Sequence, residues 1–239
     1  MSTPNNDLFT LPVLTPWKKA RFLTMAKRVL QAQQRMQTTD GKSILHYTLK
    51  GESIHKRMEH YPFDDRIDSK TGAQYYYHCH RENFESEEHG HFHCFLRYKF
   101  IPKHIKPTPL PDWDKHIANP MTHLVAIGIN RFGQPIRLFA VNRWISSEIC
   151  YDARHTPNFI QRFKMTKQDD PYWQILDQWV EAMLYLFSPQ IAWLNQQRDL
   201  KIQEHITNNP EIYPYNYEPI EELAEIKIDL NQHIQWIIN

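Results

Sequence analysis

Apolar and polar residues alternate in two stretches near the middle of the chain, 73–80 and 90–100. Because successive side chains of a β-strand point to opposite faces of a sheet, this alternation predicts two strands, each with a histidine face and an apolar face. Two further strands are predicted at 122–130 and 136–144, on either side of a glycine-containing turn. The region 71–145 is therefore predicted to form a β core.

Apolar residues recur near helical spacing before and after this core. The first predicted helix spans 15–37 and begins at a Thr-Pro pair, which is typical of a helix start. The helical part 157–206 contains two similar starts, Asp-Pro at 170–171 and Ser-Pro at 188–189. A last helix is predicted at 219–238.

Together these elements predict a single α+β domain over residues 1–239. We expect an antiparallel sheet of at least four strands, with helices from both chain ends packed on one face. The composition, 41% hydrophobic and 13% aromatic, provides enough apolar side chains for one packed core and argues against disorder.

Charge is distributed unevenly between the two ends of the chain. The helix at 15–37 has six basic residues and no acid: Lys18, Lys19, Arg21, Lys27, Arg28 and Arg35. Residues 207–239 hold six acids against Lys227 alone. The acidic C-terminal helix could pack beside the basic one, or either could meet a partner. The net charge of +1 argues against nucleic acid as a partner, and the oligomeric state is left open.

The sequence also excludes several classes of protein. It has six glycines and no G-x-G-x-x-G, phosphate-binding loop, G-x-S-x-G or H-E-x-x-H motif. No apolar run is long enough to span a bilayer, and no secretory leader is recognised. Three cysteines without a C-x-x-C pair fit a reducing, cytoplasmic location.

Five of the fourteen histidines fall within sixteen residues: His78, His80, His89, His91 and His93. Histidines two residues apart on a strand share one face. If the two strands pair with their apolar sides together, the other face gathers His78, His80, His91 and His93, because a one-residue slip would mix the faces.

Such a group is suited to a metal ion. Neutral imidazole nitrogens are good ligands for divalent transition metals, and three of them leave a coordination position for water, oxygen or substrate. We therefore expect a metal-dependent hydrolase or oxidoreductase that acts on a small polar substrate. Zinc or iron would be held by the four histidines His78, His80, His91 and His93. Glu88 or His89 would transfer protons, and Arg143 would bind an anionic group of the substrate.

Other interpretations stay open. The histidines could form a half-buried polar network that binds nothing. They could also form the site of a metal-free phosphoryl or nucleotidyl transferase. A third alternative is a metal-binding or interaction protein without catalytic activity, in which four or more ligands close the site.

Three resemblances bear on these alternatives. Gly72-x5-His78-x-His80-x4-Glu85 resembles the first metal motif of the cupins, which implies that His78, His80 and Glu85 bind a metal. The segment 89–95 resembles the histidine triad of nucleotide phosphoramidases, which implies that His91 is a nucleophile. Over most of its length the chain resembles an uncharacterised bacterial family. That resemblance rests on Q-Y-Y-Y-H-x-H-R at 74–81, E-H-G-H-F-H at 88–93, H-L-V-A-I at 123–127 and N-R-W at 142–144.

Overall fold

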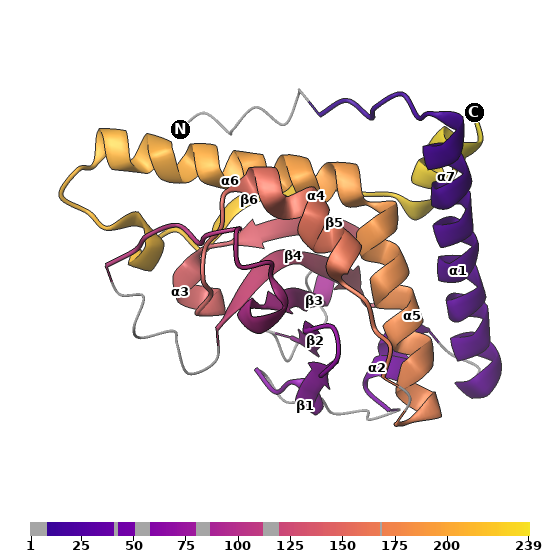
Figure 1. Ribbon diagram of the computed structural model, residues 1–239. Coiled ribbons are helices and arrows are strands. Elements are labelled where there is room, and N and C mark those ends of the chain that lie inside the picture. The colour runs from indigo at the N-terminus through magenta and orange to yellow at the C-terminus, as the bar shows by residue number, and fades with distance from the viewer. Residues whose placement is uncertain (1–8, 41–42, 51–57, 80–86, 112–119, 168) are drawn as a thin grey trace.

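One antiparallel sheet forms the centre of the molecule, and its strands are arranged in the order in which they occur along the chain (Figure 1). The computed structural model describes residues 9–40, 43–50, 58–79, 87–111, 120–167 and 169–239. The strands in this part of the chain are β1 (Tyr61–Ile67), β2 (Ala73–His78), β3 (Glu88–Arg97), β4 (Met121–Asn130), β5 (Pro135–Val141) and β6 (Glu222–Lys227).

Helices from both chain ends complete an α+β fold, as predicted. They are α1 (Pro16–Asp40), α2 (Ile44–Thr48), α3 (Arg143–Ser146), α4 (Thr156–Arg162), α5 (Pro171–Leu186), α6 (Ser188–Asn208) and α7 (Leu230–Ile238). Figure 1 shows α5 between the sheet and α1, with α7 beside the N-terminal end of α1. None of the described helices is long and apolar enough to cross a membrane.

Alternate side chains of β2 and β3 form the floor of the main core. Tyr75, Tyr77, Phe92, Cys94 and Leu96 are fully buried there, on the face predicted to be apolar. Residues of α5 pack over them, with the ring centroid of Trp179 5.6 Å from that of Phe92. Burial of each large apolar side chain contributes about 1.5–3 kcal/mol, so packing on this face fixes the register of β2 and β3. The same register determines which side chains lie together on the opposite face.

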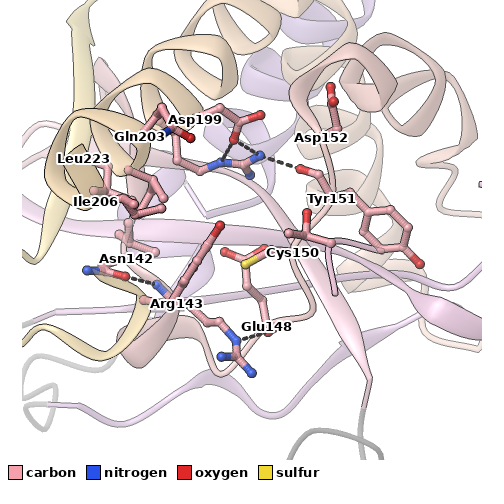
Figure 2. Close-up of a pocket in the computed structure, with 15 residues that line it drawn as sticks. Asn142, Arg143, Glu148, Cys150, Tyr151, Asp152, Asp199, Gln203, Ile206 and Leu223 are labelled. Atoms are coloured by element: carbon pink, nitrogen blue, oxygen red, sulfur yellow. Dashed lines mark hydrogen bonds and ion pairs between the residues drawn. The ribbon is translucent and has the colours of Figure 1, made fainter. Parts of the chain in front are cut away.

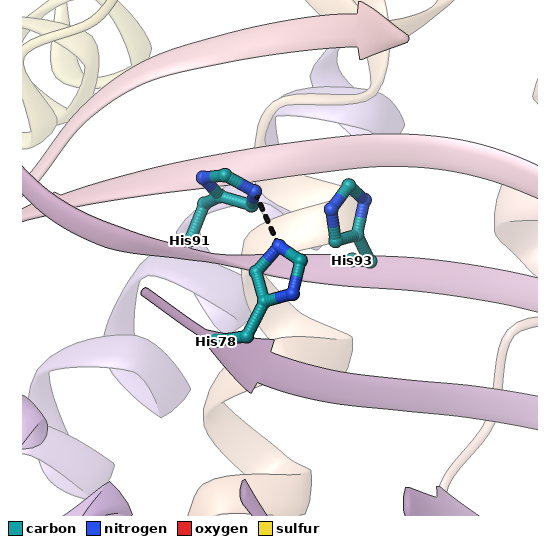
Figure 3. A group of neighbouring side chains, drawn as sticks. All are labelled: His78, His91 and His93. Atoms are coloured by element: carbon teal, nitrogen blue, oxygen red, sulfur yellow. Dashed lines mark hydrogen bonds between the residues drawn. The ribbon is translucent and has the colours of Figure 1, made fainter. Parts of the chain in front are cut away.

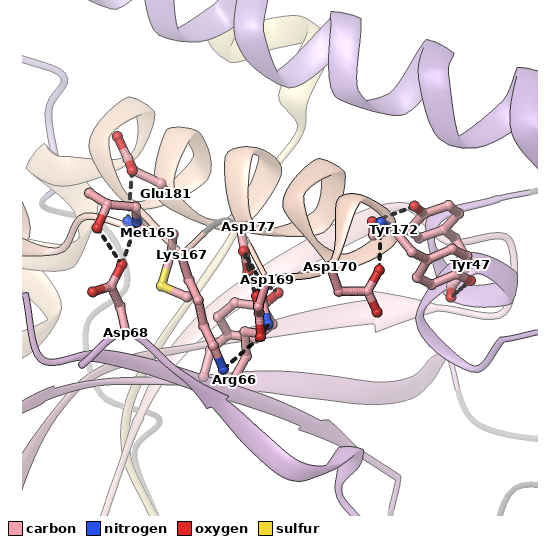
Figure 4. Close-up of polar contacts among 12 residues, drawn as sticks. Tyr47, Arg66, Asp68, Met165, Lys167, Asp169, Asp170, Tyr172, Asp177 and Glu181 are labelled. Carbon is pink, nitrogen blue, oxygen red and sulfur yellow. Dashed lines mark hydrogen bonds and ion pairs between the residues drawn. The ribbon is translucent and has the colours of Figure 1, made fainter. Parts of the chain in front are cut away.

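A buried ion pair fastens α5 to the edge of the sheet. Arg66 of β1 lies against Asp177 of α5, with nitrogen–oxygen distances of 2.7–3.1 Å (Figure 4). The hydroxyl of Tyr75 donates to the same carboxylate at 2.8 Å. Asp169 accepts a further hydrogen bond from Arg66 at 3.2 Å but is half exposed.

The two terminal helices, α1 and α7, lie side by side, although the acids of the C-terminal region all precede α7. Their contact is mostly apolar, with Phe22 of α1 and Trp236 of α7 packed edge to face at 5.8 Å. One polar contact joins Lys19 Nζ to the carbonyl oxygen of Ile238 at 2.7 Å.

The predicted helix at 219–238 is wrong over its first half, because this stretch forms β6 before α7 begins. Ala224 and Ile226 pair with Ala140 and Leu138 of β5. The edge of β5 has N–H and C=O groups that need partners, and this tertiary demand outweighs the local helical pattern.

The strand predicted at 136–144 is also too long. β5 ends at Val141, and Asn142 caps α3 by accepting a hydrogen bond from the backbone N–H of Arg143 at 2.7 Å. Asparagine favours such caps over a strand interior, so Arg143 and Trp144 lie in a short helix.

The sheet opens between β4 and β5 at one end. Paired residues run from Ile129 to Ala126 on β4, and the remaining backbone groups of β4 find other partners. The N–H of His123 donates to the Glu148 carboxylate at 2.8 Å, and Leu124 accepts from the Asn195 side chain at 2.9 Å. Side chains thus replace a missing length of ladder.

Candidate metal site

Three histidines of adjacent strands converge on the face of the sheet opposite the main core (Figure 3). The β2–β3 register places His78 opposite His91 and Tyr76 opposite His93. The side chains are buried, with 3%, 4% and 1% exposure for His78, His91 and His93. Each offers one ring nitrogen within 4.8 Å of the other two.

The spacing of these nitrogens fits a metal ion after a small adjustment. Zinc binds histidine nitrogens at about 2.1 Å, which in a tetrahedral site places the nitrogens ~3.4 Å apart. The Nε2 atoms of His78 and His91 are already 2.9 Å apart. All three nitrogens lie within 4.8 Å of one another, so this group could hold a metal.

Glu88 holds His91 in a defined orientation. Its Oε1 atom is hydrogen-bonded to Nδ1 of His91 at 2.8 Å, and its Oε2 atom accepts from Nε of Arg137 at 2.5 Å. A carboxylate on Nδ1 fixes the proton there and leaves the lone pair on Nε2, toward the other two histidines. Burial works to raise the pKa of Glu88, but the hydrogen bonds from His91 and Arg137 outweigh it and hold that pKa below its usual range.

Arg137 in turn depends on the C-terminal strand. It binds both carboxylate oxygens of Glu222 at 2.6 and 2.9 Å, and it contacts Glu225 at 3.0 Å. A chain of charged groups therefore extends from β6 through Arg137 and Glu88 to His91.

A β-bulge decides which side chains near the start of β3 reach the site. The register with β4 shifts between Glu88 and Gly90, so Glu88 joins the face of His91. His89 lies on the other face, with Nδ1 hydrogen-bonded to the Tyr77 hydroxyl at 2.7 Å. The two-residue spacing of His89, His91 and His93 predicted that all three share one face. The extra residue of the bulge instead places His89 on the opposite face.

Two glycines make this arrangement possible. A Cβ atom at Gly90 would collide with the backbone oxygen of His78 and with the Tyr77 hydroxyl. A Cβ atom at Gly128 would collide with the Glu88 carboxylate. Close approach of the backbone thus provides the space for Glu88 beside His91.

His123 is a neighbour of the group that the main sequence pattern did not include. β3 and β4 place it opposite Phe95, and its Nε2 atom is 3.1 Å from Nδ1 of His93. Burial, with smaller contributions from Arg198 and His91, lowers the pKa of His123 to about 3, so it is neutral near pH 7. Only strand pairing reveals its place, since His123 is thirty residues from His93.

His60 forms the most exposed edge of the group, with 37% of its side chain accessible. Its ring stacks on Tyr76 with centroids 3.7 Å apart, and its Nδ1 atom contacts Asp65 at 2.7 Å. The second oxygen of Asp65 accepts from Gln74 at 2.7 Å.

The remaining predicted site residues lie elsewhere. His80 and Glu85 fall outside the described residues. Arg143 is buried in α3, where its Nε atom donates to the carbonyl oxygen of Glu148 at 2.9 Å. Of the predicted residues within the described ranges, the structure therefore brings together His78, His91, His93 and Glu88, and it does not place His89 or Arg143 with them.

Comparison with known proteins identifies a family but not an activity. No curated protein and no solved structure matches this sequence. One family model, described as a domain of unknown function (DUF6969), matches residues 23–228, which is most of the chain. The expectation of an uncharacterised family is thereby confirmed, and the chain belongs to the DUF6969 family.

Proposed function

We propose that this protein is a metal-dependent enzyme, a hydrolase or oxidoreductase that acts on a small polar substrate. His78, His91 and His93 would hold one zinc or iron ion, and His80 is a further candidate ligand. The observation that carries the proposal is the convergence of three buried imidazoles, one of which is oriented by a carboxylate. When bound, the ion would supply Lewis acidity to a water, oxygen or substrate at its open position.

The burial of the three histidines supports a metal site over a network of histidines that binds nothing. Three imidazoles at ring-centroid distances of 4.7–4.9 Å would repel one another when protonated. An ion that accepts their lone pairs removes this repulsion, because each ring then stays neutral as a ligand.

The geometry supports an orienting role for Glu88. Both of its oxygens are engaged, one by His91 and one by Arg137. This favours a carboxylate that holds a ligand over one that removes a proton from substrate. The proton-transfer roles expected of Glu88 and His89 remain predictions.

The test is metal content after removal and reconstitution. Chelator-treated protein is loaded separately with Zn(II), Fe(II) without oxygen, and Co(II), and then desalted and analysed. We expect one equivalent of metal, and Co(II) absorption bands typical of nitrogen ligands. His78→Ala and His91→Ala should lose both. His89→Gln is the matched control, because it changes the same strand on the opposite face and should keep both.

Trace metal in the reconstituted wild-type protein would overturn the proposal. The rival functions give different results in the same samples. A transferase with His91 as nucleophile would keep its activity in chelator and lose it in His91→Ala. A closed, non-catalytic site would show a fourth nitrogen ligand that disappears in His80→Ala, and no turnover of ester, amide or phosphate substrates.

A further inference from the structure

A second site lies beside the C-terminal end of β5. A pocket of about 200 Å³ is found there, bordered by the end of β5, the start of β6, one face of α6 and the segment 148–152 (Figure 2). It is separate from the histidine group, because Glu148 and His123 stand between the pocket and His93.

One side of this pocket is polar and buried. Glu148 is 1% exposed, and its carboxylate accepts hydrogen bonds from the His123 backbone at 2.8 Å and the Ser146 hydroxyl at 3.1 Å. Arg198 is 7% exposed and is held by Asp199 at 2.7 Å and by the carbonyl oxygen of Tyr151 at 2.6 Å.

The other side is apolar. Val141, Ile202 and Leu223 are buried side chains that line it, and Ile206 lies at the rim with 39% exposure. A ligand that fits both sides has a short aliphatic body and one polar head.

The charges of the lining restrict that polar head. The pocket is bordered by two guanidinium groups, Arg143 and Arg198, and by three carboxylates, Glu148, Asp152 and Asp199. A charged ligand would lose its hydration and meet a buried group of its own sign, whichever sign it carried. An uncharged head with one donor and one acceptor meets no such penalty, because it can face a carboxylate and a guanidinium at once.

We propose that this pocket binds a small uncharged aliphatic carboxamide, or a molecule with the same donor–acceptor head. The volume lies below the ~300–1,000 Å³ of pockets that take drug-sized ligands, which favours a small ligand. Burial also raises the pKa of Glu148, against the opposing charge of Arg198, which makes the lining tolerant of a neutral head.

Three probes of similar size test this: isobutyramide, isobutyrate and isobutylamine, which share an isopropyl group and differ in the charge and shape of the head. Each is titrated into ¹⁵N-labelled full-length protein, and amide shifts of residues 148–152 and 198–206 are followed. We expect isobutyramide to saturate with a dissociation constant of about 1 mM, as six atoms of ordinary ligand efficiency provide. The two charged probes should bind at least tenfold more weakly.

Variants identify the pocket. Ile206→Trp should fill the rim and weaken isobutyramide at least tenfold, whereas Leu200→Trp, at a 62% exposed position of the same helix, should leave it unchanged. Glu148→Gln keeps the shape of the side chain and removes its charge, so isobutyrate should bind at least fivefold more tightly than to wild type. His91→Ala should bind isobutyramide normally, which keeps this result distinct from the metal proposal.

Two results would overturn the proposal. One is a lack of saturable shifts with isobutyramide in folded wild-type protein. The other is tighter binding of either charged probe to wild type, which would assign the pocket to an acid or an amine instead.

Discussion

Glu88 uses each of its two oxygens for a different side chain. One is hydrogen-bonded to the imidazole of His91, and the other accepts from the guanidinium of Arg137. Neither contact is local in the usual strand pattern, since the first depends on the bulge and the second crosses from β3 to β5. The Glu88 carboxylate therefore links the candidate ligand His91 to Arg137 of β5, so the orientation of His91 depends on where β5 lies.

Glu88→Ala is predicted to weaken metal affinity by about 10–100-fold, because His91 loses the group that fixes its proton and orientation. Glu88→Gln should weaken it less, since an amide oxygen can still accept from Nδ1 of His91. Competition with a chromophoric chelator measures both. Glu87→Ala is the control, because Glu87 is the exposed neighbour of Glu88 and should have wild-type affinity.

The two acidic partners of Arg66 differ in burial and should differ in energy. Asp177→Ala is predicted to lower the free energy of unfolding by about 3–5 kcal/mol, because it leaves a buried guanidinium without its main partner. Asp169→Ala should cost less than ~1 kcal/mol, because that carboxylate is 46% exposed. Urea unfolding of the two variants tests the difference, and equal losses would contradict it.

At the scale of elements, α7 is held by a buried histidine. His233 stacks on Phe187 with ring centroids 4.3 Å apart. Its Nε2 atom donates to the carbonyl oxygen of Leu186 at 2.8 Å, and Nδ1 accepts from Gln190 at 3.0 Å. Both nitrogens are thus used by the neutral ring. Burial lowers the pKa of His233 to about 4, against the weaker effect of the Leu186 carbonyl.

This lowered pKa predicts acid sensitivity of the C-terminal helix. The unfolded chain takes up the His233 proton near pH 6.5, and the folded chain does so only near pH 4. The stabilising contribution is therefore complete above pH 6.5 and falls as the pH drops toward 4, by roughly 3 kcal/mol in all.

The difference in unfolding free energy between wild type and His233→Gln measures this contribution as a function of pH. It should shrink between pH 6.5 and pH 4. His104→Gln, at an exposed position, should show no such dependence. A difference that is constant with pH would rule out the proposed linkage.

Elements were predictable where local chemistry and tertiary packing agree. α5 and α6 begin at Pro171 and at Ser188, where the Asp-Pro and Ser-Pro pairs indicated helix starts. The stretch that became β6 was not predictable in the same way. Ala224 and Ile226 alternate with charged residues, but a six-residue alternation is ambiguous until the edge of β5 is known to need a partner.

The candidate site was predictable only where it depends on the spacing of residues within one strand. Histidine spacing on two paired strands was enough to bring His78, His91 and His93 together. It could not place His89, because a bulge adds a residue that period-2 reasoning does not count. Arg137 and His123 belong to strands that pair over long sequence distances, so their part in the site depends on register and not on any local motif.

At the scale of the whole molecule, metal binding and folding should be linked. An ion held by residues of β2 and β3 binds the folded chain, so it stabilises that state by about 2.7 kcal/mol at 100 times its dissociation constant. For a chain of this size we expect a rise in Tm of roughly 5–10 °C with Zn(II) over the chelated protein.

Calorimetry at matched protein concentration checks this. His91→Ala should show little or no rise, and His104→Ala, at an exposed site, should behave as wild type. An equal rise in all three proteins would point to zinc bound elsewhere.

The bulge at Glu88 and Gly90 also bears on how this site could change over time. Point substitutions around it alter one side chain, but the effect of losing a single codon depends on which residue is lost. Loss of His89 would restore regular pairing and keep Glu88 on the face of His91, whereas loss of Glu88 would move His89 to that face. A carboxylate-supported group of three imidazoles would in the second case become a group of four on one surface. A change of length at this one codon is thus a route by which relatives could acquire a different ion preference.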